Sequence, residues 1–99
     1  MHIISRKKLK QFYEQSKYKD AEGPLEAWFY EARHADWLTP ADIKALYRSA
    51  DILKDNRVVF NIGGNKYRLV IKINYPTKTV FIRFIGTHRE YDRIDAEVI

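Results

Sequence analysis

Residues Arg57 to Thr87, RVVFNIGGNKYRLVIKINYPTKTVFIRFIGT, decide the fold of this chain. Apolar and β-branched residues alternate here with polar ones, which is the period-two pattern of strands. Gly63-Gly64 supplies the positive φ that a tight hairpin requires, and residues 75–78 form a second turn. The pattern therefore predicts an antiparallel meander of three strands, at Arg57–Ile62, Lys66–Asn74 and Thr79–Ile85.

Upstream of this stretch the apolar residues change to helical spacing. The short run His2-Ile3-Ile4 reads as a first strand. Thr39-Pro40-Ala41-Asp42 is a strong helix start, because Thr39 caps the helix and Pro40 needs no hydrogen-bond partner in the first turn. The expected helices cover residues 6–15, 25–34 and 39 to 49 or 51. After the strands, Thr87 and Glu90 predict the cap of a short C-terminal helix.

The whole chain, residues 1–99, is expected to be one α+β domain. Its N-terminal strand and two to three helices would pack on one face of a mostly antiparallel sheet. The chain has no cysteine, which excludes disulfides and thiolate chemistry. It shows no apolar run long enough for a signal peptide or a membrane span, so we expect a cytoplasmic protein.

The net charge of +5 is unevenly distributed. Residues 1–20 carry six Lys or Arg against two acidic residues, and residues 57–93 carry eight against two, whereas the segment between them is acidic. This polarity suits a polyanion such as nucleic acid. A solvated surface that is merely basic remains an alternative.

The strand at Lys66–Asn74 would place Tyr67, Leu69, Ile71 and Ile73 toward the helices. The opposite face would then present three cations in a row: Lys66, Arg68 and Lys72. If Val80, Ile82 and Phe84 form the core side of the next strand, Arg83 joins these cations. Phe81 would lie among them as a platform for a stacked base. The alternative is an ordinary solvated sheet face.

The segment Thr87-His88-Arg89-Glu90-Tyr91-Asp92 is the second candidate for chemistry. Histidine exchanges protons near neutral pH, and Tyr91 would share a helix face with His88. Both residues could instead be structural. The sequence offers no metal-ligand spacing, phosphate loop or nucleophile elbow, so neither a metal nor a cofactor is expected.

Two runs carry a family resemblance: VVFNIGGNKYRLV at 58–70 and FIRFIGTHREYD at 81–92. Together with WLTPADIK at 37–44, they resemble the HigB-type toxins of bacterial toxin–antitoxin modules, which belong to the RelE superfamily. The resemblance spans essentially the whole chain in element order and is strongest from Asn56 to Asp95.

The resemblance implies a toxin that enters the ribosomal A site and cuts messenger RNA without a metal. The nucleotide's own 2′-hydroxyl would attack the phosphate and leave a 2′,3′-cyclic phosphate, and a HigA-like helix-turn-helix antitoxin would restrain the toxin. Arg68 matches the superfamily's central-strand arginine, His88 the general acid or base, and Tyr91 a residue that orients or exchanges a proton, or stacks on a base. The supporting RNA-binding residues would be Lys66, Lys72, Phe81, Arg83 and Arg89.

A binding module is the main alternative. It would be a basic domain, or a degenerate toxin, that binds RNA or the antitoxin without cleaving anything. Binding needs the arginine and lysine residues but no titrating pair, so His88 and Tyr91 separate the two hypotheses.

Overall fold

The computed structural model describes all residues, 1–99, and has the expected α+β architecture. A five-stranded sheet has the order β1-β5-β4-β3-β2, with only β1 parallel to its neighbour. None of the helices combines the length and the apolar composition that a membrane span requires. The strands are β1 (His2–Ile4), β2 (Asp51–Ile52), β3 (Arg57–Ile62), β4 (Tyr67–Asn74) and β5 (Thr79–Thr87). The helices are α1 (Arg6–Tyr13), the 3-10 helix η1 (Ser16–Ala21), α2 (Glu22–His34), α3 (Pro40–Leu46) and α4 (His88–Tyr91).

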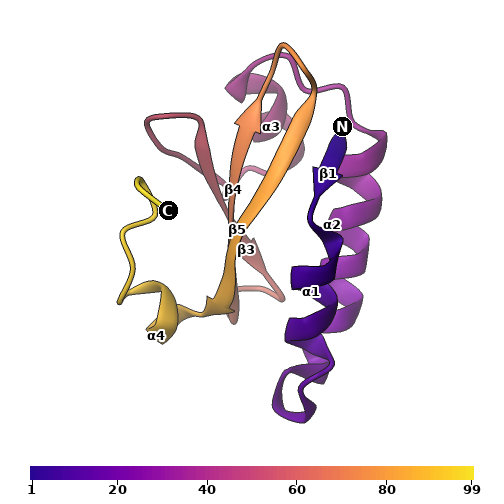
Figure 1. Ribbon diagram of the computed structural model, residues 1–99, viewed down its shortest axis with the longest axis vertical. Helices are drawn as coiled ribbons and strands as arrows, with labels where there is room; N and C mark the ends of the chain where they lie inside the picture. Colours follow the sequence, from indigo (N-terminus) through magenta and orange to yellow (C-terminus); the bar gives the residue numbers. More distant parts are fainter.

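The sheet separates the molecule into two sides. Helices α1 and α2 lie on one side, and α4 with the C-terminal segment lies on the other (Figure 1). The main core forms on the side of α1 and α2, because the apolar faces of these helices meet the apolar alternation of the strands. Its fully buried members include Leu9, Leu25, Trp28, Leu69, Ile71, Ile73 and Val80.

The opposite sheet face is not the open face that the alternation predicts. Val59 and Val70 are buried there under Ala96, and Leu53, Phe84, Tyr91, Ile94 and Ile99 pack around them. We call this face, from Asp51 on β2 to Phe84 on β5, the C-terminal face. The chain that follows α4 therefore covers the middle of the expected cationic surface.

A bulge in β5 explains a second difference from the predicted pattern. Val70 pairs with Phe84 and Ile71 pairs with Ile82, so Arg83 has no partner on β4. One extra residue reverses the alternation beyond it. Phe84 consequently lies on the C-terminal face and not, as predicted, on the core side with Val80 and Ile82. Ile85 takes the core side in its place.

The local signals for turns and caps are confirmed. Gly63 and Gly64 both have positive φ, at 63° and 69°. The backbone N–H of Thr39 donates to the Asp42 carboxylate at 3.1 Å, as a capping side chain at this position requires. Helix α3 nevertheless ends at Leu46, before the expected 49 or 51, because Asp51–Ile52 pairs with Val58 and Val59 as the edge strand β2.

Candidate active site

The short helix α4 begins where β5 ends, and a capping box fixes its start. The Glu90 N–H donates to Thr87 Oγ1 at 3.1 Å, and the Thr87 N–H donates to Glu90 Oε1 at 2.9 Å. This pair of bonds satisfies two backbone donors that a helix start would otherwise leave free. The box holds His88 and Tyr91 on the first turn beyond the sheet.

Gly86 allows this turn to approach the sheet closely. It pairs with Arg68 on β4, so α4 starts directly beside that arginine. A Cβ at Gly86 would lie 2.6 Å from the Phe84 ring and 3.0 Å from the Glu90 carboxylate. No side chain fits there without moving Phe84 or breaking the capping box.

Arg68, His88 and Tyr91 converge in the structure, as the family resemblance implies. The Arg68 Nε–H donates to His88 Nε2 at 3.2 Å. The Arg68 guanidinium carbon lies 5.0 Å from the centre of the Tyr91 ring, within the range of a cation–π contact. The arginine side chain is only 19% exposed. Because Nε2 accepts this bond, a neutral His88 carries its proton on Nδ1.

Two residues beside Arg68 were not identified from the sequence. Asp51 Oδ2 lies 3.6 Å from Arg68 Nη1, reaching it from the edge strand β2. Asn61 is directly opposite Arg68 on β3, and its side-chain oxygen is buried without a hydrogen-bond partner. Asp51 lies outside the runs that carry the family resemblance, and Asn61 lies within one of them but was not recognised as a site residue. Their position follows from strand pairing, which brings Asp51 opposite Val59 and Asn61 opposite Arg68.

The predicted row of cations is wrong in two places. Lys66 lies in the turn before β4 and forms an ion pair with Asp20 of η1. It therefore does not continue a row of cations with Arg68. Arg83 occupies the bulge of β5, where its exposed side chain borders a groove beside α1. The β-alternation alone could not show either change, because one depends on a turn and the other on a bulge.

Lys72, Phe81 and Arg83 form a separate cluster on the sheet. Lys72 and Phe81 are directly opposite each other on β4 and β5, and both are half-buried. The Arg83 guanidinium carbon lies 5.6 Å from the Phe81 ring centre. Phe81 therefore lies between these cations as predicted. Lys72 is four residues from Arg68, about 13 Å along the strand, and Val70 separates them under the C-terminal segment.

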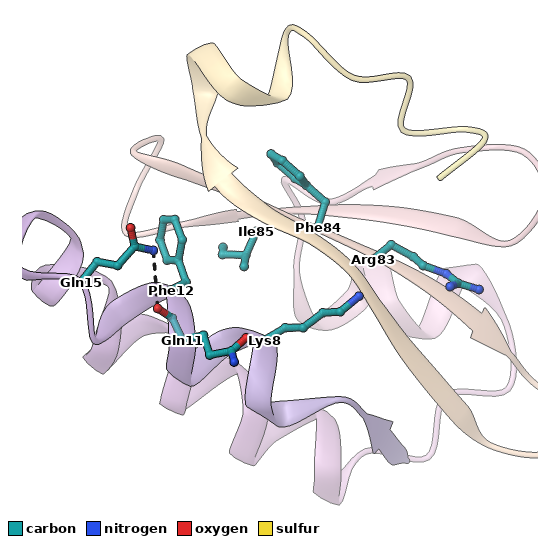
Figure 2. A pocket seen from close by; sticks show the side chains of 7 residues that line it. All are labelled: Lys8, Gln11, Phe12, Gln15, Arg83, Phe84 and Ile85. Atoms are coloured by element: carbon teal, nitrogen blue, oxygen red, sulfur yellow. Dashed lines mark hydrogen bonds between the residues drawn. The ribbon is translucent and has the colours of Figure 1, made fainter.

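Two surface hollows border the candidate site residues, one at Arg83 and the other at Tyr91. A shallow groove of about 340 Å³ runs between α1 and β5, lined by Lys8, Gln11, Phe12, Gln15, Arg83, Phe84 and Ile85 (Figure 2). Figure 2 shows Phe84 pointing toward α4, away from Lys8 and Gln11. The second hollow, of about 530 Å³, borders Tyr91 and is lined also by Leu53, Asp92, Ile94, Asp95, Ala96 and Glu97. Arg89 is exposed on α4 between the two site residues His88 and Tyr91.

Comparisons with known proteins agree with this arrangement. The model of a family described as HigB toxin, the RelE-like toxic component of a toxin–antitoxin system, matches residues 21–94. The mRNA interferase toxin HigB of Escherichia coli K12 is 35% identical over 94 residues, which are 93% of this chain and 88% of that protein. The mRNA interferase HigB of Shigella flexneri is similar to the same extent. The mRNA interferase HigB of Escherichia coli O6:H1 is 28% identical over 96 residues, covering 95% and 91% of the two chains.

Proposed function

Because the chain belongs to the HigB family of RelE-like toxins, we propose that it cleaves messenger RNA with Arg68, His88 and Tyr91. The similar proteins are named mRNA interferases, and we assign the same activity, cleavage of messenger RNA, to this chain. The observation that carries the proposal is the contact between Arg68 and His88. It places a permanent cation beside an imidazole, the side chain that most often serves as a general acid or base.

Cleavage without a metal requires two things of the protein. A base must take the proton of the 2′-hydroxyl while an acid protonates the departing 5′-oxygen, and a cation must stabilise the phosphoryl oxygens as charge grows on them. Arg68 supplies the cation: its Nη2 donates to no protein atom, so that nitrogen is available to a phosphate oxygen. His88 supplies one of the two proton-transfer groups. The bond breaks at the 5′-oxygen and leaves a 2′,3′-cyclic phosphate.

Tyr91 is assigned to proton transfer or to a hydrogen bond with the substrate. Arg68 already occupies one face of its ring, and the hollow beside the ring is lined by the carboxylates of Asp92, Asp95 and Glu97. These acids repel an RNA phosphate, which disfavours a base stacked on Tyr91. Its hydroxyl forms no hydrogen bond within the protein and is free to act on the substrate.

The nucleotides on either side of the scissile phosphate would bind to the cations around this site. Lys72, Phe81 and Arg83 offer two charges around an aromatic ring, the combination that binds single-stranded RNA. Arg89 is exposed beside His88 and can meet an adjacent phosphate. Lys66 contributes less, because Asp20 neutralises it. We place this activity on the ribosome, at its A site in the bacterial cytoplasm, under the control of a HigA-like antitoxin.

The test is cleavage of a defined message by the purified toxin, both on programmed ribosomes and as free RNA. We expect Arg68→Ala and His88→Ala each to lower the cleavage rate by at least about a hundredfold, because each removes a transition-state contact. Both variants should keep the wild-type circular dichroism spectrum. No group of three or more His, Asp or Glu side chains in the structure could hold a metal, and we expect EDTA to leave the rate unchanged.

Two results would overturn the proposal. Full activity in both variants would remove Arg68 and His88 from the site. A wild-type protein that binds ribosomes or RNA tightly but leaves no cyclic phosphate would favour the alternative, a basic module that binds without cutting.

A further inference from the structure

Arg68 makes one contact that phosphate binding does not explain. The Asp51 carboxylate lies 3.6 Å from its Nη1, on the side of the guanidinium away from β5. We propose that Asp51 is a positioning residue, which orients Arg68 so that Nε faces His88 and Nη2 faces the scissile phosphate. This inference rests on the proposed roles of Arg68 and His88.

The geometry around the guanidinium carries the argument. The group is planar, and its N–H donors point in fixed directions within that plane. Nε is bonded to His88 and one face is against Tyr91, but these two contacts leave the far end of the plane free to tilt. Asp51 Oδ2 lies 3.6 Å from Nη1, so it attracts that far end as an ion pair at a distance longer than a hydrogen bond. Of the three guanidinium nitrogens, Nη2 alone has neither a hydrogen bond nor an ion pair within the protein, so it is the nitrogen that we assign to the ligand.

The position of Asp51 is inconsistent with a mainly stabilising role. Its side chain is 60% exposed on a two-residue edge strand. Ion pairs with so exposed a partner contribute little to folding. Removing the carboxylate should therefore leave the fold intact, and any effect on the reaction can be measured in a folded protein.

The charge of Asp51 predicts a kinetic signature. A carboxylate beside a phosphate-binding arginine repels the phosphate and so weakens RNA binding. If Asp51 nevertheless orients Arg68, its loss slows the chemical step while binding becomes equal or tighter. A merely structural residue would produce no such opposite effects, and neither would a residue that binds RNA directly.

The experiment compares Asp51→Asn, Asp51→Glu and the control Asp36→Asn. Asp36 is similarly exposed, at 65%, and pairs with Lys78 at 2.7 Å outside the site. We expect Asp51→Asn to lower kcat about tenfold without raising KM, because a tilt of Arg68 should cost less than the roughly hundredfold that a 1 Å misplacement can cost. Asp51→Glu should restore most of the rate, because it restores the charge. Asp36→Asn should change neither constant.

A second measurement needs no substrate. In a ¹⁵N NMR spectrum, the Arg68 Nε–H signal should be protected from solvent exchange by its bond to His88 and should lose this protection in Asp51→Asn. An unchanged kcat and an unchanged signal in that variant would overturn the inference, as would a raised KM with normal kcat. If the inference about Asp51 is overturned in this way but Arg68→Ala is inactive, the proposed site still stands. If Arg68→Ala and His88→Ala retain full activity, the proposed site fails, and this inference fails with it.

Discussion

The ring of Tyr91 packs against other side chains of the protein, whereas its hydroxyl has no partner there. The ring supports Arg68 at 5.0 Å and contacts Phe84, with 6.4 Å between ring centres. It also packs at the margin of the small apolar cluster around Val70. The hydroxyl has no partner in the protein. A phenylalanine would therefore keep every packing contact and remove only the group that could act on RNA.

Tyr91→Phe should slow cleavage without weakening RNA binding. We expect a loss of about a hundredfold in kcat, at the lower end of what proton transfer by a side chain contributes. Tyr30→Phe is the matched control, since Tyr30 is 65% exposed on α2, outside the site. The measurement is single-turnover cleavage together with a binding titration. A kcat equal to wild type would limit Tyr91 to supporting Arg68 through its ring.

At the scale of the element, α4 is a single turn and depends on its cap. Helices this short are not stable on their own, because nucleation is unfavourable. The capping box and the contact of Tyr91 with the sheet hold it in place. The positions of His88 and Tyr91 therefore depend on the capping box that Thr87 and Glu90 form.

Thr87→Ala tests this dependence. Loss of an N-cap side chain costs about 1 kcal/mol, so the global stability should fall only slightly. The cleavage rate should fall more, because His88 leaves its place beside Arg68. Thr87→Ser keeps the accepting oxygen and should retain activity. Urea unfolding and cleavage assays on both variants provide the comparison, and equal activity in all three proteins would show that packing alone positions α4.

The elements also show what could be predicted from the sequence. Strands β3, β4 and β5, the Gly63-Gly64 turn and the helix starts at Thr39 and Thr87 follow from local patterns, and the structure confirms them. The convergence of Arg68 with His88 was expected from the family resemblance, and the pairing of Arg68 with Gly86, two residues before His88, accounts for it in the structure. The bulge at Arg83 was not predictable, since its effect appears only in the pairing of two strands.

Other features of the site depend on tertiary structure. Strand β2 has two residues, too few for a periodic pattern, so Asp51 could not be placed beside Arg68. The C-terminal segment covers Val70 by means of Ala96. The sequence pattern gives no sign of this contact. An exposed cationic face was therefore expected where the structure has a covered one.

At the scale of the whole molecule, charged side chains serve different purposes on the two sides of the sheet. The C-terminal face carries the candidate active site, whereas tyrosine–carboxylate pairs connect elements on the helical side. Tyr13 of α1 donates to Glu26 of α2 at 2.5 Å, and Arg6 donates to the same carboxylate at 2.8 Å. The bond to Glu26 raises the pKa of Tyr13 to about 12. The same bond, with that of Arg6, holds the pKa of Glu26 below its ordinary value of 4.5.

These shifts predict losses of stability at both ends of the pH range. The lowered pKa of Glu26 stabilises the fold above about pH 4.5, and this contribution is lost as the pH falls through the folded-state value. The raised pKa of Tyr13 acts in the opposite direction. Its contribution is complete below pH 10, the ordinary pKa of tyrosine, and is lost as the pH rises to about 12.

Glu26→Gln should therefore flatten both limbs of the pH–stability curve. Glutamine still accepts a hydrogen bond but does not titrate, and without the carboxylate the pKa of Tyr13 returns toward 10. Tyr67, whose pKa burial and Asp20 raise to about 12, keeps its own share of the alkaline loss, so the limb should become shallower without disappearing. The measurement is the urea midpoint across the pH range, with Glu14→Gln as control, because Glu14 is exposed on the C-cap of α1 without a side-chain partner. Parallel curves for Glu26→Gln and wild type would contradict the assignment.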